Sequence, residues 1–122
     1  MTADVSIYEA IKGEYVNTTF FNKFPQSVNL QEATEKILVK NISQIKQDDK
    51  DKIGRYEVTY RIEVIGTNYM NCKDTAAAIT TLLEGYTDEH VYLVRYDGET
   101  YDTNDTAEIH RVIVDYIAFI NL

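Results

Sequence analysis

Histidine and cysteine, the side chains best suited to acid–base and nucleophilic chemistry near neutral pH, are scarce in this chain. His90 and His110 are its two histidines, and neither has neighbours at a spacing typical of a metal pair or of a nucleophile's base. Cys72 is the single cysteine and falls on the apolar stripe of a predicted helix, which favours a buried, inert thiol. We therefore expect surface or edge histidines, a packing cysteine and no catalytic residue.

Acidic residues are concentrated in two segments that could gather oxygen ligands for a divalent cation. The first contains Asp48, Asp49 and Asp51, and the second contains Asp97, Glu99, Asp102 and Asp105. Neither segment matches the EF-hand calcium loop with its glycine and terminal bidentate glutamate. The glycines stand singly at the ends of predicted elements, so a phosphate-binding loop is not expected either. The sequence predicts solvated turns, no metal and no cofactor.

The charge of the chain argues against several classes of partner. Its 122 residues carry a formal charge of −8, without a cluster of lysine and arginine that could neutralise a run of phosphates. We expect no tight binding of nucleic acid. The sequence has no apolar run long enough for a membrane span, and its first residues lack the pattern of a signal peptide. Together with the single cysteine, this predicts an intracellular, soluble protein with one domain, residues 1–122.

Helical periodicity is present in two stretches of the sequence, and the predicted helices must pack on the strands that carry the candidate residues. The first begins at a cap on Thr2 or Asp4 and ends near Tyr15. Its apolar positions are Val5, Tyr8, Ile11 and Tyr15. The second starts near Asn71 or Asp74 and stops at Gly85. Its apolar stripe is Cys72, Ala76, Ile79 and Leu83.

Strand patterns occupy two stretches between the predicted helices. Residues 35–45 place Ile37 and Val39 on one face, while Leu38 and Ile42 partly fill the other, which predicts a strand covered on both faces. Residues 55–64 alternate polar and apolar side chains without an error. In that strand the residues Tyr56, Val58, Tyr60, Ile62 and Val64 form the core face, and Arg55, Glu57, Thr59, Arg61 and Glu63 the wet face.

Two further strands are predicted after the second helix, at residues 90–98 and 108–120, with the polar turn-forming segment 97–107 between them. The last strand is apolar on both faces, as in a central antiparallel strand. The sequence therefore predicts an α+β domain with an antiparallel-dominated sheet of four to five strands and two helices packed on one face.

The opposite face of this sheet needs another cover, because its apolar residues would otherwise face water. That cover could come from the phenylalanine-rich segment before Pro25 or from another chain. The candidate oligomer interface is Phe20, Phe21, Phe24, Ile113, Ile117 and Phe119. An equally open alternative is that the three phenylalanines fill the core of one monomer. On the interface hypothesis, Phe21→Asp would leave the fold intact and abolish association.

The order of motifs along the chain is also informative. It comprises an N-terminal helix, FFNKFPQ at 20–26, a long alternating strand closing in VIGTN at 64–68, a helix DTAAAITTLLEGY at 74–86, and a final strand HRVIVDYIAFI at 110–120. This order resembles the tail terminator or tail-completion proteins of long-tailed bacteriophages. The resemblance covers nearly the full chain.

The resemblance implies a virion structural protein without catalytic residues. It would form a homo-oligomer, usually a hexameric ring, that ends polymerisation of the tail tube and joins the tail to the head connector. Its partners would be the tail tube protein and the head connector protein, and it would assemble in the host cytoplasm and reside in the tail or neck. The acidic segments would then contact a partner or line a lumen that does not hold DNA.

Three alternative functions compete with this one. A small acidic adaptor or inhibitor could bind a basic surface of one protein partner through the same acidic segments. Another head or neck completion protein would have a similar size and composition. A small enzyme or ligand-binding domain would need a pocket with convergent polar groups, which the sequence does not indicate.

Overall fold

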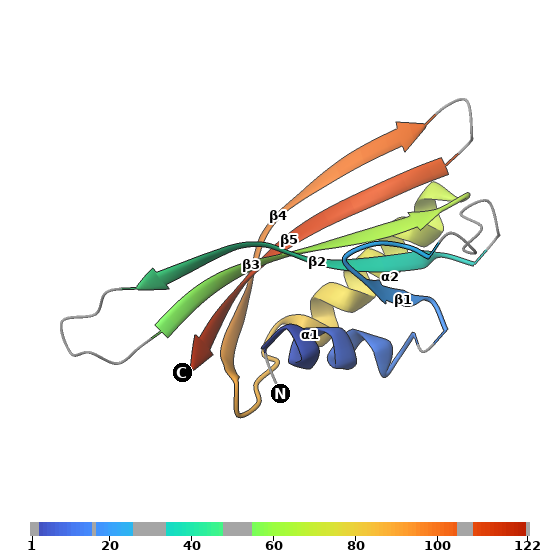
Figure 1. Ribbon diagram of the computed structural model, residues 1–122. Helices are drawn as coiled ribbons and strands as arrows, with labels where there is room; N and C mark the ends of the chain where they lie inside the picture. The colour runs from blue at the N-terminus through green and yellow to red at the C-terminus, as the bar shows by residue number, and fades with distance from the viewer. Residues whose placement is uncertain (1–2, 16, 26–33, 48–54, 105–108, 122) are drawn as a thin grey trace.

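The computed structural model describes residues 3–15, 17–25, 34–47, 55–104 and 109–121. The elements, in chain order, are α1 (Ala3–Lys12), β1 (Thr19–Phe21), β2 (Lys36–Gln47), β3 (Arg55–Gly66), α2 (Tyr69–Leu83), β4 (Val91–Asn104) and β5 (Ile109–Asn121). The strands form one sheet in the order β1-β2-β3-β5-β4 (Figure 1). The β1–β2 pair is parallel, whereas β2–β3, β3–β5 and β5–β4 are antiparallel. The predicted fold class is confirmed, and β5 is a central strand as expected.

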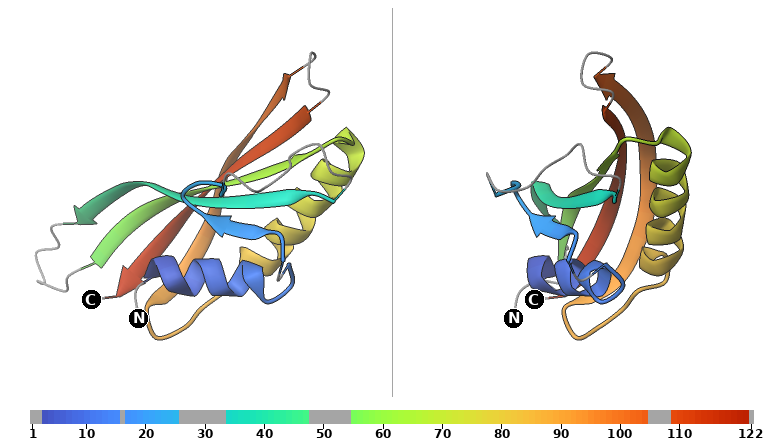
Figure 2. Two further views of the ribbon diagram at one scale, coloured as in Figure 1. Left: turned by 45° about the vertical axis from the view of Figure 1, so that its right-hand side comes forward. Right: turned by 90° about the vertical axis from the view of Figure 1, so that its right-hand side faces the viewer.

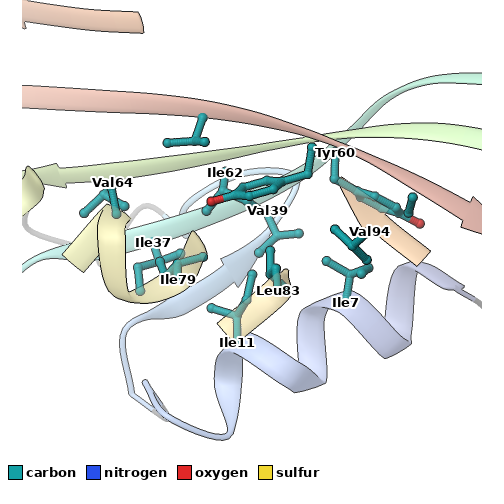
Figure 3. Packing of buried hydrophobic residues seen from close by; sticks show 14 of the residues in the cluster. Ile7, Ile11, Ile37, Val39, Tyr60, Ile62, Val64, Ile79, Leu83 and Val94 are labelled. Carbon is teal, nitrogen blue, oxygen red and sulfur yellow. The ribbon is translucent and has the colours of Figure 1, made fainter. Parts of the chain in front are cut away.

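Both helices lie on the same side of the sheet (Figure 2). The core between the layers takes the even-numbered positions of β3 and β5, because successive side chains of a strand point to opposite faces. From the helices it takes Ile7, Ile11, Ile79 and Leu83, which belong to the same buried cluster as Tyr60 and Val94 (Figure 3). The predicted core face of β3 is confirmed for Val58, Tyr60, Ile62 and Val64, which are all buried.

Helix α2 follows its sequence pattern closely. The side chain of Asn68 caps it by accepting a hydrogen bond of 3.0 Å from the backbone N–H of Asn71. Its buried residues are Cys72, Ala76, Ile79 and Leu83, the stripe that the periodicity predicts. The chain leaves the helix through Gly85, whose φ of 82° lies in the left-handed region that favours glycine. The helix starts at Tyr69, slightly earlier than expected.

Helix α1 differs from its prediction in length and in face. It ends at Lys12 instead of near Tyr15, and it buries Ser6 and Ile7 while Val5 is 40% exposed. The reason is tertiary, since α1 packs against α2 and β1 at once, and this orientation turns Ile7 and Ile11 toward the sheet. Val5 was therefore assigned to the wrong face.

Strand β1 splits the phenylalanine-rich segment between the two sides of the sheet. Phe20 is paired with Leu38 and Phe21 with Val39, so the two rings point to opposite faces. Asn22 then takes a φ of 68° and donates its backbone N–H to the carbonyl of Val39 at 2.8 Å. This turn ends the strand just before Pro25, as the proline predicts.

Strand β4 is much longer than the sequence pattern indicates. It extends to Asn104 and includes Asp97, Glu99 and Asp102, which were expected in a turn. Two register shifts, at Val91/Leu93 and Tyr96/Gly98, keep it paired with β5 along its length. The long apolar β5 supplies backbone groups that need hydrogen-bond partners, and this overrides the turn propensity of the polar residues.

The connection between α2 and β4 is organised by the carboxylate of Asp88. Its Oδ1 accepts hydrogen bonds from the backbone N–H groups of His90 at 2.7 Å and Val91 at 2.8 Å, and its Oδ2 accepts one from Tyr86 Oη at 2.9 Å. Burial acts to raise the pKa of Asp88, but the hydrogen bonds from the two backbone groups and Tyr86 outweigh it, so the pKa is lowered. The ionised form therefore stabilises the fold.

Replacing Asp88 by alanine is expected to lower the free energy of unfolding by about 1–2 kcal/mol at neutral pH, because several donors lose their acceptor. Since the folded-state pKa lies below the unfolded value, the stability from ionised Asp88 is present above about pH 4 and is lost as the pH falls through the folded pKa. Denaturant melts across this range should show the difference between wild type and Asp88→Ala shrinking at acidic pH. A difference that stays constant with pH would show that Asp88 acts only through its shape.

Candidate functional site: the open face of the sheet

The side of the sheet opposite the helices, called here the open face, is covered by no helix among the described residues (Figure 2). The odd-numbered residues of β5 point to it, and Ile113, Ile117 and Phe119 are half-buried there. Phe119 contacts the ring of Tyr92 at 5.9 Å between centroids, and the guanidinium of Arg95 lies 5.6 Å from its centroid. Leu93, also on β4, is exposed. The open face therefore carries apolar side chains on β5 and at Leu93 of β4, beside the charged Arg95.

A buried carboxylate lies within this face, on β3. Glu63 is only 2% exposed, and its two oxygens face Lys40 Nζ on β2 at 2.6 Å and Arg111 Nη1 on β5 at 3.3 Å. The alternating pattern predicted a solvent-exposed position for Glu63, and this prediction is wrong. The neighbouring strands supply the cations, so the ionised carboxylate is neutralised in place rather than by water.

A second ion pair crosses the same strands one step further along. Arg61 on β3 and Asp115 on β5 form a two-pronged contact, with Nε to Oδ1 at 2.9 Å and Nη2 to Oδ2 at 3.1 Å. This hydrogen bonding to Asp115 raises the pKa of Arg61. Along β5 the open face thus presents Ile113, Asp115 and Ile117 in turn, and Asp115 is already paired with Arg61. A face of this kind can be covered by another protein without leaving those charges unpaired.

The structure brings most of the predicted interface residues to this one face. Phe20 lies beside Leu38 on the open face and contacts Phe24 with ring centroids 5.4 Å apart. Phe21 instead points to the helix side, where its ring lies 6.1 Å from that of Tyr8 and packs against the core. A charge at Phe21 is therefore expected to disturb the fold of its own chain.

The predicted acidic sites do not form one cluster. Asp48, Asp49, Asp51 and Asp105 lie outside the described residues. Asp97 and Asp102 are exposed along β4, whereas Glu99 points to the helix side and forms an ion pair with Lys73 of α2. Within the described ranges there is no group of three or more acidic, histidine or cysteine residues that could hold a metal ion.

The two histidines have structural surroundings. His110 Nδ1 lies 2.7 Å from Tyr101 Oη, and the two rings stack near Tyr69. His90 lies next to Glu89, with 3.4 Å between Nε2 and Oε1. Neither imidazole has a cysteine or serine side chain as a hydrogen-bond partner among the described residues, so no nucleophile and base pair is assembled there.

None of the helices in the described part of the chain is long and apolar enough to span a membrane.

Cys72 is buried under α2, with Sγ 3.9 Å from the carbonyl oxygen of His110. Burial, with a smaller contribution from Glu35, raises the pKa of this thiol to about 11. We expect a thiol reagent to leave the native chain unmodified at about pH 8 and to react at once in denaturant, because only the thiolate is nucleophilic. Cys72→Ala should cost about 1–2 kcal/mol of stability without affecting association. Fast labelling of the native chain would contradict this assignment.

Comparison with solved structures shows a likeness of fold. No family model matches the chain, and no curated protein matches it. A solved structure described as "Virion of native gene transfer agent (GTA) particle" contains a chain that superposes with a TM-score of 0.78 at 13% sequence identity. The match covers 99% of this chain and 96% of that chain. The fold is thus similar along nearly the whole length to that of a chain of that particle.

Proposed function

We propose that this chain is a virion structural protein that forms a ring at the junction of head and tail, where it ends the polymerisation of the tail tube and joins the tail to the head connector. The observation that carries the proposal is the likeness in fold, over nearly all of both chains, to a chain of a gene transfer agent virion. The motif order that resembles tail terminator proteins points in the same direction.

The open face supports a role in assembly. Its half-buried isoleucines and phenylalanines alternate with charges that are already paired, which suits contact with another protein surface. A ring is the natural product of a repeated head-to-tail contact whose rotation closes. The net charge of −8 also suits a lumen through which DNA passes without being held.

The proposal is tested with purified protein and tail tubes assembled from the tube protein of the same virus. Light scattering should give the mass of six chains for the purified protein. Electron microscopy should show rings at tube ends, and tubes capped in this way should stop growing when more tube protein is added. Growth at the usual rate with no rings at the ends would contradict the role of terminator.

The same experiments separate the alternatives. Another neck component would form a ring but leave tube growth unchanged. A small acidic adaptor or inhibitor would stay monomeric, and its binding to a basic partner would depend on exposed acids such as Asp97 and Asp102. Charge reversal at those two positions would abolish the binding of an adaptor and leave capping of tubes intact.

A further inference from the structure

The open face carries one cation that lacks an acidic partner. Arg95 of β4 is exposed there, opposite Ile117 in the register, and its guanidinium lies over the ring of Phe119. Among the described residues no carboxylate forms an ion pair with it, whereas Arg61 is paired with Asp115. A protein that covers Ile117 and Phe119 would take water away from Arg95. Such a partner should therefore bring an apolar surface together with a carboxylate.

A second copy of this chain offers both on α2. This helix is the outermost layer on its side of the sheet (Figure 2). Its exposed residues in the last three turns, called here the outer face of α2, are Asp74, Ala77, Ala78, Thr81 and Glu84. The small side chains in the middle let a helix approach a sheet closely. The only charges on the outer face are the two carboxylates, and neither has an ion-pair partner among the described residues.

Glu84 has an unfavourable position in the free chain. It is the C-cap residue of α2, and the last turn of the helix contains no basic residue. The C-terminal end of a helix carries a partial negative charge, so a carboxylate there is repelled and a cation is favoured. Arg95 of another copy would be attracted by the carboxylate and by the helix end together. The unpaired anion of one surface thus complements the unpaired cation of the other.

The two surfaces also match in length. The outer face of α2 spans ten residues from Asp74 to Glu84, or about 15 Å of helix. On β5 the distance from Ile113 to Ile117 is about 14 Å of strand. With Glu84 beside Arg95, at the level of Ile117, Asp74 falls near Ile113 at the other end. The docked helix would then run in the same direction as β5.

The chain's own α2 already has this direction on the inner side of the sheet. The ring of Tyr69, the first residue of α2, lies 6.1 Å from that of His110 near the start of β5. Further along both elements, Thr80 Oγ1 is 2.6 Å from Tyr116 Oη. A sheet in the assembly would thus have one parallel α2 on each side. Because rotation about an axis along β5 keeps this direction, a repeated contact of this kind can close into a ring.

We propose that the outer face of α2 in one copy of this chain docks on the open face of the next copy, with α2 parallel to β5 and Glu84 beside Arg95. This inference rests on the proposed ring and names the contact that builds it. The contact is head-to-tail, because the two surfaces are different. Met70, one turn before Asp74, lies outside it.

Charge reversal in two separate chains tests the contact. Arg95→Glu damages only the open face, and Glu84→Arg damages only the outer face of α2. Each variant alone should associate about tenfold or more weakly than wild type in sedimentation, measured with and without tail tubes. In an equal mixture, alternating copies bring the new carboxylate at position 95 to the new guanidinium at position 84 and keep the native pair at every other contact. The mixture should therefore recover the oligomer.

Glu9→Arg is the matched control, since it makes the same charge change at an exposed position on α1. This variant should associate as wild type does. A label on Arg95→Glu should enter the oligomer when that chain is mixed with Glu84→Arg and stay out of it when mixed with Glu9→Arg. All the changed positions are exposed, so circular dichroism should be native. The proposal is overturned if the mixture with Glu84→Arg shows no recovery, or if Arg95→Glu alone associates normally.

Ala77→Trp provides a measurement that does not depend on charge. Ala77 is exposed in the free chain, so the larger ring should leave thermal melting nearly unchanged. In the assembly it would hold the helix away from the sheet, and association should weaken by about tenfold or more. Native association of this variant would show that the outer face of α2 is not covered.

The failure of this inference can be told apart from that of the proposed function. If wild-type rings cap tubes but the mixed variants do not recover association, the contact between α2 and the open face is wrong and the terminator role stands. If the mixture recovers the oligomer but tube growth is unaffected, the contact stands and the terminator role is wrong.

Discussion

Tyr60→Ala is expected to lower the free energy of unfolding by about 3–5 kcal/mol, the range for removing a large ring from a core. Tyr60 is fully buried on β3, among Ile7, Val94 and other residues of the cluster between sheet and helices (Figure 3). Its hydroxyl group donates a hydrogen bond of 2.5 Å to Asp4 Oδ1, which ties β3 to the first turn of α1. The substitution would therefore create a cavity and also release the N-terminal helix.

Tyr60→Phe is the matched variant that separates these two contributions. It keeps the ring and removes only the hydroxyl group, so a loss of about 1–2 kcal/mol is expected. Burial and the hydrogen bond to Asp4 raise the pKa of Tyr60, so the hydroxyl group remains a donor at all pH values suitable for the measurement. Denaturant melts of both variants give the two values. Equal losses for Tyr60→Phe and Tyr60→Ala would mean that the hydrogen bond, not the ring, accounts for the stability.

Ile117→Asp is expected to abolish association while leaving the chain folded. Ile117 lies in the middle of the open face, half-buried, with Thr59 and Arg95 beside it on the neighbouring strands. In the free chain the new carboxylate can reach water and Arg95. Under a covering protein it would have to lose that water, at a cost of several kcal/mol, or weaker binding by about a hundredfold or more.

The control for this variant is Met70→Asp, which adds the same charge on α2 at a position that is 62% exposed. Circular dichroism and thermal melting should give nearly native values for both variants. Light scattering and tube capping should fail for Ile117→Asp alone. Normal assembly by a folded Ile117→Asp chain would show that the open face is not an interface, and unfolding of the variant would place Ile117 in the core of the monomer.

Local periodicity in the sequence was enough to predict the fold class and much of the core. The stripe from Cys72 to Leu83 and the alternation from Val58 to Val64 are properties of single elements, set by the 3.6- and 2-residue repeats of helix and strand. The pattern of β5 likewise predicts its place between two other strands, β3 and β4, although helices cover only one of its two faces. These features need no knowledge of which elements meet.

Other features were decided by contacts between residues far apart in the chain. Glu63 sits at a polar position of an alternating strand, yet the register brings Lys40 and Arg111 to its two sides and allows it to be buried as an ion. Asp97 to Asn104 have turn composition, but the backbone of β5 needs partners and holds them in β4. Phe20 and Phe21 look equivalent in sequence, and only the three-residue pairing of β1 with β2 sends one to the open face and the other to the core. In each case the interaction that favours the observed structure is made with an element distant in the sequence. A local sequence pattern therefore could not predict it.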